Sequence, residues 1–90
     1  MKVVFSDENN AFEDFTSWAS EDIKIFKKIL SLIRDIKRNP YDGIGKPEEL
    51  KHDFSGFWSR RIDKKHRLVY QISEDESTLM IAACKNHYDD

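Results

Sequence analysis

The sequence predicts an α+β fold with an N-terminal strand, in which two helices pack on one face of a small antiparallel sheet. Three observations support this prediction. Two successive segments within residues 6–39 carry apolar residues at helical spacing, a short β-branched stretch precedes them, and strand-like stretches follow within residues 57–87. Since 90 residues leave room for one domain, we expect residues 1–90 to form a single domain.

The first strand is expected at residues 2–5, which are mostly β-branched or aromatic. Ser6 is expected to cap the first helix, with Asp7 and Glu8 placed favourably against the helix dipole. This helix should end near Ala19. Its apolar residues follow at helical spacing: Ala11, Phe12, Phe15, Trp18 and Ala19.

The second helix is expected to begin directly after Ser20, which caps it and places Glu21 and Asp22 in its first turn. On a helical wheel its apolar residues fill about half of the circle. They are Ile23, Ile25, Phe26, Ile29, Leu30, Leu32, Ile33 and Ile36. An arc this wide needs two neighbours, so we expect it to pack between the first helix and the sheet. Pro40 should stop the helix, because proline disfavours helical geometry at the preceding Asn39.

The second half of the chain is predicted to be mostly strands. Residues 41–49 contain two glycines and a proline and are expected to form a loop. Strands are expected at residues 57–62 and 66–72, joined by a three-residue turn, and at residues 79–87.

Alternation along these strands predicts the core only in part. It places Leu68, Tyr70 and Ile72 on the core side of their strand, with Arg67 on the opposite side. In the last strand both alternating sets are apolar, so either side could be core. A bulge would also shift the alternation.

Charge is distributed unevenly along the chain, whose net charge is -2. Residues 1–22 hold one lysine against six acidic residues, residues 23–72 hold thirteen lysines and arginines against six, and residues 73–90 hold one against five. The basic middle suggests a surface for nucleic acid, although a solvated helix face and acidic turns would give the same pattern.

Two simpler features indicate a cytoplasmic protein. The longest apolar runs are too short to cross a bilayer, so no membrane partner is expected. Cys84 is the single cysteine, so there is no disulfide framework, and we expect it to be a small buried hydrophobic residue.

Residues 43–70 combine the groups that a protein needs in order to bind and act on a polyanion. Cationic side chains neutralise phosphates, aromatic side chains stack on bases, and a carboxylate can accept a proton. The alternative interpretation is a solvated loop followed by an ordinary charged hairpin.

The run GKPEELKHDFSGFWSRRIDKKHRLVY, followed by the terminal LMIAACKNHY, resembles the YoeB/Txe toxins of the RelE superfamily. No single motif is specific to this family, but their combination at these spacings is. The motifs are KPE, LKH, GFWSRRI, HRLVY and a closing HY. The resemblance implies a cytoplasmic toxin of a type II toxin–antitoxin pair, which cuts mRNA in the ribosomal A site without a metal or other cofactor. It implies three partners: an antitoxin of the YefM/Axe type, the ribosome with its A-site mRNA, and a second copy of the toxin.

The resemblance also implies roles for individual residues. Glu48 matches the base that removes the proton of the 2′-hydroxyl group, and His87 matches the acid that protonates the departing 5′-oxygen. Imidazole suits that role because it titrates near neutral pH. Arg67 matches the cation beside the phosphorane, where a guanidinium stays charged and binds phosphate oxygens bidentately.

Three further positions match the family's site. Lys51 and Arg61 match supporting phosphate-binding positions, and Tyr88 matches a residue placed at the nucleotide. Structural roles are expected for three other residues of the matching stretch: His52, Trp58 and His66.

Two other functions are compatible with the same stretch. One is a binding module that blocks the ribosomal A site without cutting. The other is a degenerate relative that retains only a protein-interaction role. The joint presence of Glu48, Arg67 and His87 favours the enzyme, because a pure binder would need only the cations.

Overall fold

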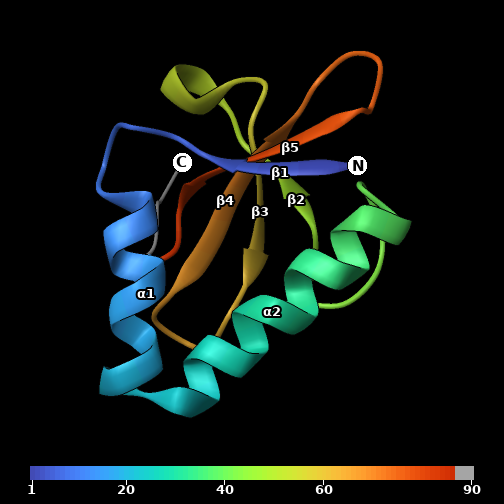
Figure 1. The fold of residues 1–90 in the computed structure, drawn as a ribbon. Coiled ribbons are helices and arrows are strands. Elements are labelled where there is room, and N and C mark those ends of the chain that lie inside the picture. The colour runs from blue at the N-terminus through green and yellow to red at the C-terminus, as the bar shows by residue number, and fades with distance from the viewer. Residues whose placement is uncertain (87–90) are drawn as a thin grey trace.

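The computed structural model of the chain describes residues 1–86, and Figure 1 shows their fold. Both helices lie on one face of a five-stranded sheet with the strand order β1-β5-β4-β3-β2. The expected α+β fold is therefore confirmed. The elements are β1 Lys2–Phe5, α1 Ala11–Glu21, α2 Ile23–Arg38, β2 Glu48–Glu49, the 3₁₀ helix η1 His52–Phe54, β3 Trp58–Arg61, β4 Arg67–Ile72 and β5 Thr78–Ala83.

The sheet is mixed, which corrects the expectation of a wholly antiparallel one. β1 pairs in parallel with β5, from Lys2 opposite Thr78 to Phe5 opposite Ile81. The other neighbouring strands run antiparallel. Parallel neighbours need a long crossover connection, and here both helices and three strands supply it.

The start of α1 differs from the prediction, because Ser6 does not cap the helix. The residue before the helix is Asn10, which adopts a left-handed conformation with φ 54°. Ser6 instead accepts a hydrogen bond from the backbone N–H of Glu8 within the preceding turn. Asparagine tolerates the left-handed region better than most residues, so the chain turns here before the helix begins at Ala11.

The start of α2 also differs, because α1 continues to Glu21 and Ser20 lies inside it. Asp22 caps α2, and its carboxylate accepts from the backbone N–H groups of Lys24 and Ile25. A carboxylate at this position also interacts favourably with the helix dipole.

Other boundaries are close to the predicted ones. The second helix ends at Arg38, as expected. The predicted loop at residues 41–49 closes with the short strand β2, where Glu48 pairs with Ser59 and Glu49 with Trp58. The last strand ends at Ala83, so it is shorter than the predicted 79–87. Within residues 1–86 no helix is long and apolar enough to cross a bilayer.

A bulge decides which side of β5 is core. Val69 pairs with Ala83, but the next residue, Tyr70, pairs with Ile81, so Ala82 is the extra residue. Ile81 consequently faces the helices, whereas Ala82 and Ala83 both belong to a cluster on the opposite face. This settles the question that alternation left open.

The main core lies between the helices and the sheet, and it includes Leu68 and Tyr70 with Ile72 packed against it, as predicted. Its buried residues are Trp18, Ile29, Leu32, Ile33, Ile36, Ile62, Leu68, Tyr70, Leu79, Ile81 and Cys84. Burial raises the pKa of the Cys84 thiol to about 12, and its predicted role as a buried hydrophobic residue is confirmed.

Arg60 is a fully buried charged residue in this core. Its Nη1 donates to the Asp35 carboxylate at 2.6 Å and to the carbonyl oxygen of Ile44 at 3.2 Å. Its Nη2 donates to the carbonyl oxygens of Asn39 at 2.6 Å and Asp42 at 2.8 Å. Its Nε donates to the hydroxyl group of Tyr70 at 3.2 Å, so the side chain makes five hydrogen bonds.

This network fastens the connection between α2 and β2 to the sheet. The Ile44 N–H and then the Arg60 guanidinium hold the pKa of the Asp35 carboxyl below its usual range, so this carboxyl stays ionised at neutral pH. Gly43 lies so close that a Cβ there would overlap the Asp35 carboxylate, and its φ of 123° also favours glycine. Residues 40–44 are therefore held by Asp35 of α2 and by Arg60 of β3.

We expect Arg60→Met to lower the free energy of unfolding by about 3–5 kcal/mol, because the buried oxygens that it bonds would lose their donors. Urea unfolding at neutral pH measures this as a lower midpoint. The matched control is Arg61→Met at the exposed neighbour, which should change stability by about 0.5 kcal/mol or less. Equal effects of the two substitutions would contradict the role assigned to Arg60.

Candidate functional site

Charged side chains gather on the sheet face opposite the helices. The register pairs Glu48 with Ser59 and Arg61 with Arg67. Residues two apart on a strand share a face, so Ser59 and Arg61 lie on the same side. Val69, the other partner of Ser59, belongs to the cluster on the open face. Glu48, Arg61 and Arg67 therefore share this face.

These residues line one hollow of about 180 Å³, which we call the acid–base hollow. It brings together three of the predicted site residues, Glu48, Arg61 and Arg67. Lys51 is exposed before η1 and does not line it. His87 and Tyr88 lie outside the described residues. The hollow's lining residues are Lys46, Pro47, Glu48, Ser59, Arg61 and Arg67.

Backbone contacts place the acidic wall of the hollow. The backbone N–H of Arg61 donates to the carbonyl oxygen of Gly45 at 2.6 Å, which holds the chain immediately before Lys46. Pairing with Ser59 then places Glu48 at the start of β2. Glu48 is therefore fixed between an anchored turn and a strand, although its side chain is exposed.

Arg67 is oriented by its own turn. Its Nη1 donates to the carbonyl oxygens of Asp63 at 3.1 Å and His66 at 3.4 Å. Within residues 1–86 no group accepts a hydrogen bond from its Nε or Nη2. A guanidinium presents them in a fork that matches two oxygens of a phosphate.

The chain just before His87 is held next to Arg67. The backbone N–H of Asn86 donates to Nδ1 of His66 at 2.7 Å, and its carbonyl oxygen accepts from the backbone N–H of Arg67 at 3.0 Å. Two residues earlier, the carbonyl oxygen of Cys84 accepts from Nε1 of Trp18 at 3.0 Å. His66 is buried and edge-on to Trp18, as its expected structural role requires.

Trp58 and His52, for which structural roles were also expected, differ in burial. Trp58 packs against the main core, with its ring 4.9 Å from that of Tyr41. His52 is exposed at the start of η1. Three residues of the hollow had no predicted role, Lys46, Pro47 and Ser59. Lys46 and Pro47 stand within the GKPE run, and alternation along the strand would have placed Ser59 beside Arg61.

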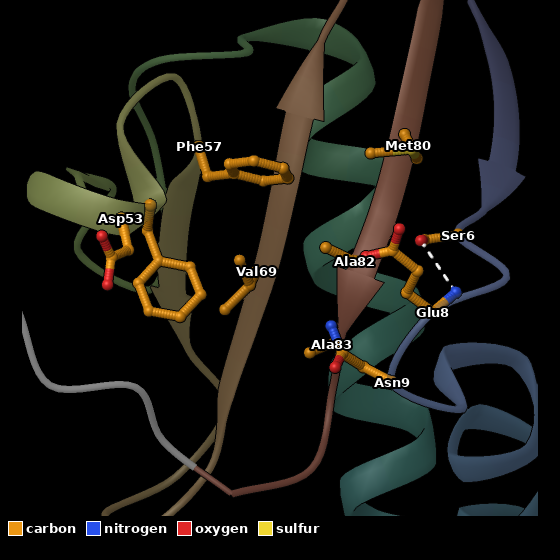
Figure 2. A pocket seen from close by; sticks show the side chains of 10 residues that line it. Ser6, Glu8, Asn9, Asp53, Phe57, Val69, Met80, Ala82 and Ala83 are labelled. Atoms are coloured by element: carbon orange, nitrogen blue, oxygen red, sulfur yellow. Dashed lines mark hydrogen bonds between the residues drawn. The ribbon is translucent and has the colours of Figure 1, made fainter.

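An apolar groove of about 340 Å³ lies beside the acid–base hollow on the same face. Figure 2 shows Phe57 and Val69 on one side of it, with Ser6, Glu8 and Asn9 from the segment after β1 on the other. Since Val69 is the register partner of Ser59, the groove and the hollow are neighbours.

The composition of the acid–base hollow suits an anion. Its lining includes three cationic residues, Lys46, Arg61 and Arg67, and one carboxylate, that of Glu48. An anion bound by the cations would lie beside a group that can accept a proton. Within residues 1–86, no cluster of three or more histidine, cysteine or acidic side chains is arranged to hold a metal ion.

The family match and the similar proteins name the same kind of protein. Residues 7–88 match the family of YoeB-like toxins of bacterial type II toxin–antitoxin systems. The toxin YoeB of Escherichia coli strain K12 is 51% identical over 88 residues, covering 98% of this chain and 100% of that protein.

Solved structures agree with this. A YoeB/ParE toxin from Agrobacterium tumefaciens superposes with a TM-score of 0.91 at 42% identity, covering 98% of this chain and 100% of that one. Two structures from Staphylococcus aureus, a heterotetrameric YoeB–YefM complex and a YoeB dimer, give TM-scores of 0.85 and 0.86. Both are 44% identical and cover 98% of each chain.

We expect His66→Phe to release the backbone of Asn86. Phenylalanine keeps a ring against Trp18 but has no acceptor, so the Asn86 N–H loses a hydrogen bond worth about 1 kcal/mol. Amide hydrogen exchange at Asn86, followed by NMR, should become about fivefold faster. The control is His52→Phe at the exposed histidine, which should leave that rate unchanged. An unchanged rate in His66→Phe would show that the bond does not hold Asn86.

Proposed function

Because this chain belongs to the YoeB-like toxins of bacterial type II toxin–antitoxin systems, we propose that it is an endoribonuclease that cuts mRNA in the A site of the ribosome. The observation that carries the proposal is the acid–base hollow, where Glu48 lies with Arg61 and Arg67. A protein that only occupied the A site would need the cations but not the carboxylate.

The first step of the proposed reaction is attack of a ribose 2′-hydroxyl group on the adjacent phosphorus. Glu48 accepts the hydroxyl proton while the new oxygen–phosphorus bond forms. The phosphorane that results carries more negative charge than the phosphodiester. Arg67, whose Nε and Nη2 have no acceptor within residues 1–86, stabilises it together with Arg61.

The second step breaks the bond between phosphorus and the 5′-oxygen of the next nucleotide. His87 donates the proton that this oxygen takes up, and Tyr88 contacts the nucleotide. The products are a 2′,3′-cyclic phosphate and a free 5′-hydroxyl group. The hydrogen bonds of Asn86 to His66 and Arg67 support these roles, because they hold the preceding residue beside the acid–base hollow.

The neighbouring apolar groove supports RNA as the substrate. Its wall includes the ring of Phe57, and an aromatic ring beside a phosphate-binding hollow offers a stacking surface for a base. Stacking is tolerant of sequence, which suits a toxin that must act on many messages.

The partners follow from the same proposal. An antitoxin of the YefM type should neutralise the protein, since a relative from Staphylococcus aureus was solved in a YoeB–YefM complex. A homodimer is expected as well, since a YoeB from Staphylococcus aureus was solved as a dimer. Both partners, and the ribosome, would be met in the cytoplasm. Lys51 is proposed to contact RNA outside the hollow.

We expect Glu48→Gln to slow cleavage of mRNA on purified ribosomes by roughly 10²- to 10⁴-fold, because glutamine keeps the shape but cannot accept the proton. Binding of the variant to ribosomes should change little. Single-turnover cleavage of labelled mRNA measures the first effect, and co-sedimentation measures the second.

The matched control for this experiment is Glu49→Gln, which removes the same charge one residue further along β2. Glu49 is not among the residues that line the acid–base hollow, so the rate should stay close to that of the unchanged protein. Full cleavage by the Glu48→Gln variant would remove Glu48 from the mechanism.

A further inference from the structure

A second, larger hollow of about 520 Å³ adjoins the acid–base hollow, and we call it the basic hollow. The two share three cationic residues, Lys46, Arg61 and Arg67. The basic hollow adds Lys28 from the middle of α2 and Lys64 from the turn between β3 and β4. Two cations from elements far apart in the sequence therefore extend the wall of the candidate site.

These cations are not neutralised by the described part of the chain. None of the five takes part in a salt bridge within residues 1–86. The acidic residue of the basic hollow is Asp63, and its carboxylate accepts from the backbone N–H groups of Lys65 at 2.8 Å and His66 at 2.6 Å. Even with Glu48 of the acid–base hollow, two carboxylates face five cations, so positive charge is in excess.

Lys28 differs from the other lysines of α2. It is half-buried, whereas Lys24, Lys27 and Lys37 are exposed. Lys28 therefore lies partly against the protein, and it also lines the basic hollow. A lysine held in this way loses less conformational freedom when it binds an anion than a fully exposed lysine does.

From these observations we infer that the basic hollow is a second phosphate-binding subsite, which holds the phosphodiester next to the one being cut. This rests on the proposed function, because the acid–base hollow would hold the scissile phosphate. Consecutive phosphates of one RNA strand lie close together, and two hollows that share three cations are close enough to hold them. Lys28 and Lys64 would then fix the register of the strand.

The test uses 2′-O-methyl RNA oligonucleotides, which lack the attacking hydroxyl group and so cannot be cut. A dinucleotide carries one phosphodiester and a trinucleotide carries two. NMR titration of the full chain should show tighter binding of the trinucleotide. In the Lys28→Gln/Lys64→Gln variant, trinucleotide affinity should fall about fivefold at 0.1 M salt, and dinucleotide affinity should not change.

Salt dependence gives a second readout. Each phosphate contact on a single strand contributes about −0.7 to the slope of log affinity against log salt concentration. The double variant should lose about this much of the slope for the trinucleotide. The matched control is Lys24→Gln/Lys37→Gln, which removes two charges from α2 outside the basic hollow and should leave the slope unchanged. The single variant Lys64→Gln also tests the subsite. Because Lys64 lies in the turn between β3 and β4, this substitution alters no helix.

Unchanged trinucleotide affinity and slope in the Lys28→Gln/Lys64→Gln variant would overturn the subsite. The subsite would also be overturned if the variant bound ribosomes without mRNA more weakly but bound the trinucleotide as before. The basic hollow would then contact ribosomal RNA. Failure of the proposed function would look different. The unchanged protein would leave ribosome-bound mRNA intact, whatever the oligonucleotide affinities are.

Discussion

The buried contact of the Arg60 guanidinium with Asp35 fastens the connection between α2 and β2 to the sheet. A buried charge is tolerated only when it is paired and hydrogen-bonded, and this side chain makes five hydrogen bonds. They join α2, the connection after it, β3 and β4. That connection leads directly into Lys46 and Glu48, so an element of the core determines where the acidic wall of the site lies. Its neighbour Arg61 faces the other way, into the site.

The fold could be predicted from the sequence where one local pattern decides the outcome. The apolar arc of α2 and the alternation around Tyr70 are examples, because each repeats over several turns or residues. The helix caps were harder to predict. Ser20 and Asp22 are both suitable capping residues, and Asp22 caps α2 because α1 continues to Glu21. The parallel pairing of β1 with β5 depends on the whole topology, and the bulge at Ala82 depends on how two strands meet. Neither has a local signal.

The candidate site was predicted from residue types and a family resemblance, and the fold shows only where some of these residues lie. Glu48, Arg61 and Arg67 meet in one hollow, whereas Lys51 lies outside it. Alternation assigns two adjacent arginines to opposite faces of β3, but the register with β4 decides which of them faces the core. Lys28 lies on α2, whereas the other residues that line the basic hollow lie within residues 45–67. No spacing in the sequence indicates that Lys28 joins them.

We propose that RNA bound in the acid–base hollow is cut by attack of a ribose 2′-hydroxyl group on the adjacent phosphate. To test this, the protein is incubated with purified ribosomes that carry a defined mRNA, and both new ends of that mRNA are identified. We expect a break within the A-site codon, with a 2′,3′-cyclic phosphate on the upstream fragment and a 5′-hydroxyl group on the downstream one. Stalled ribosomes on intact mRNA, or fragments that begin with a 5′-phosphate, would contradict it.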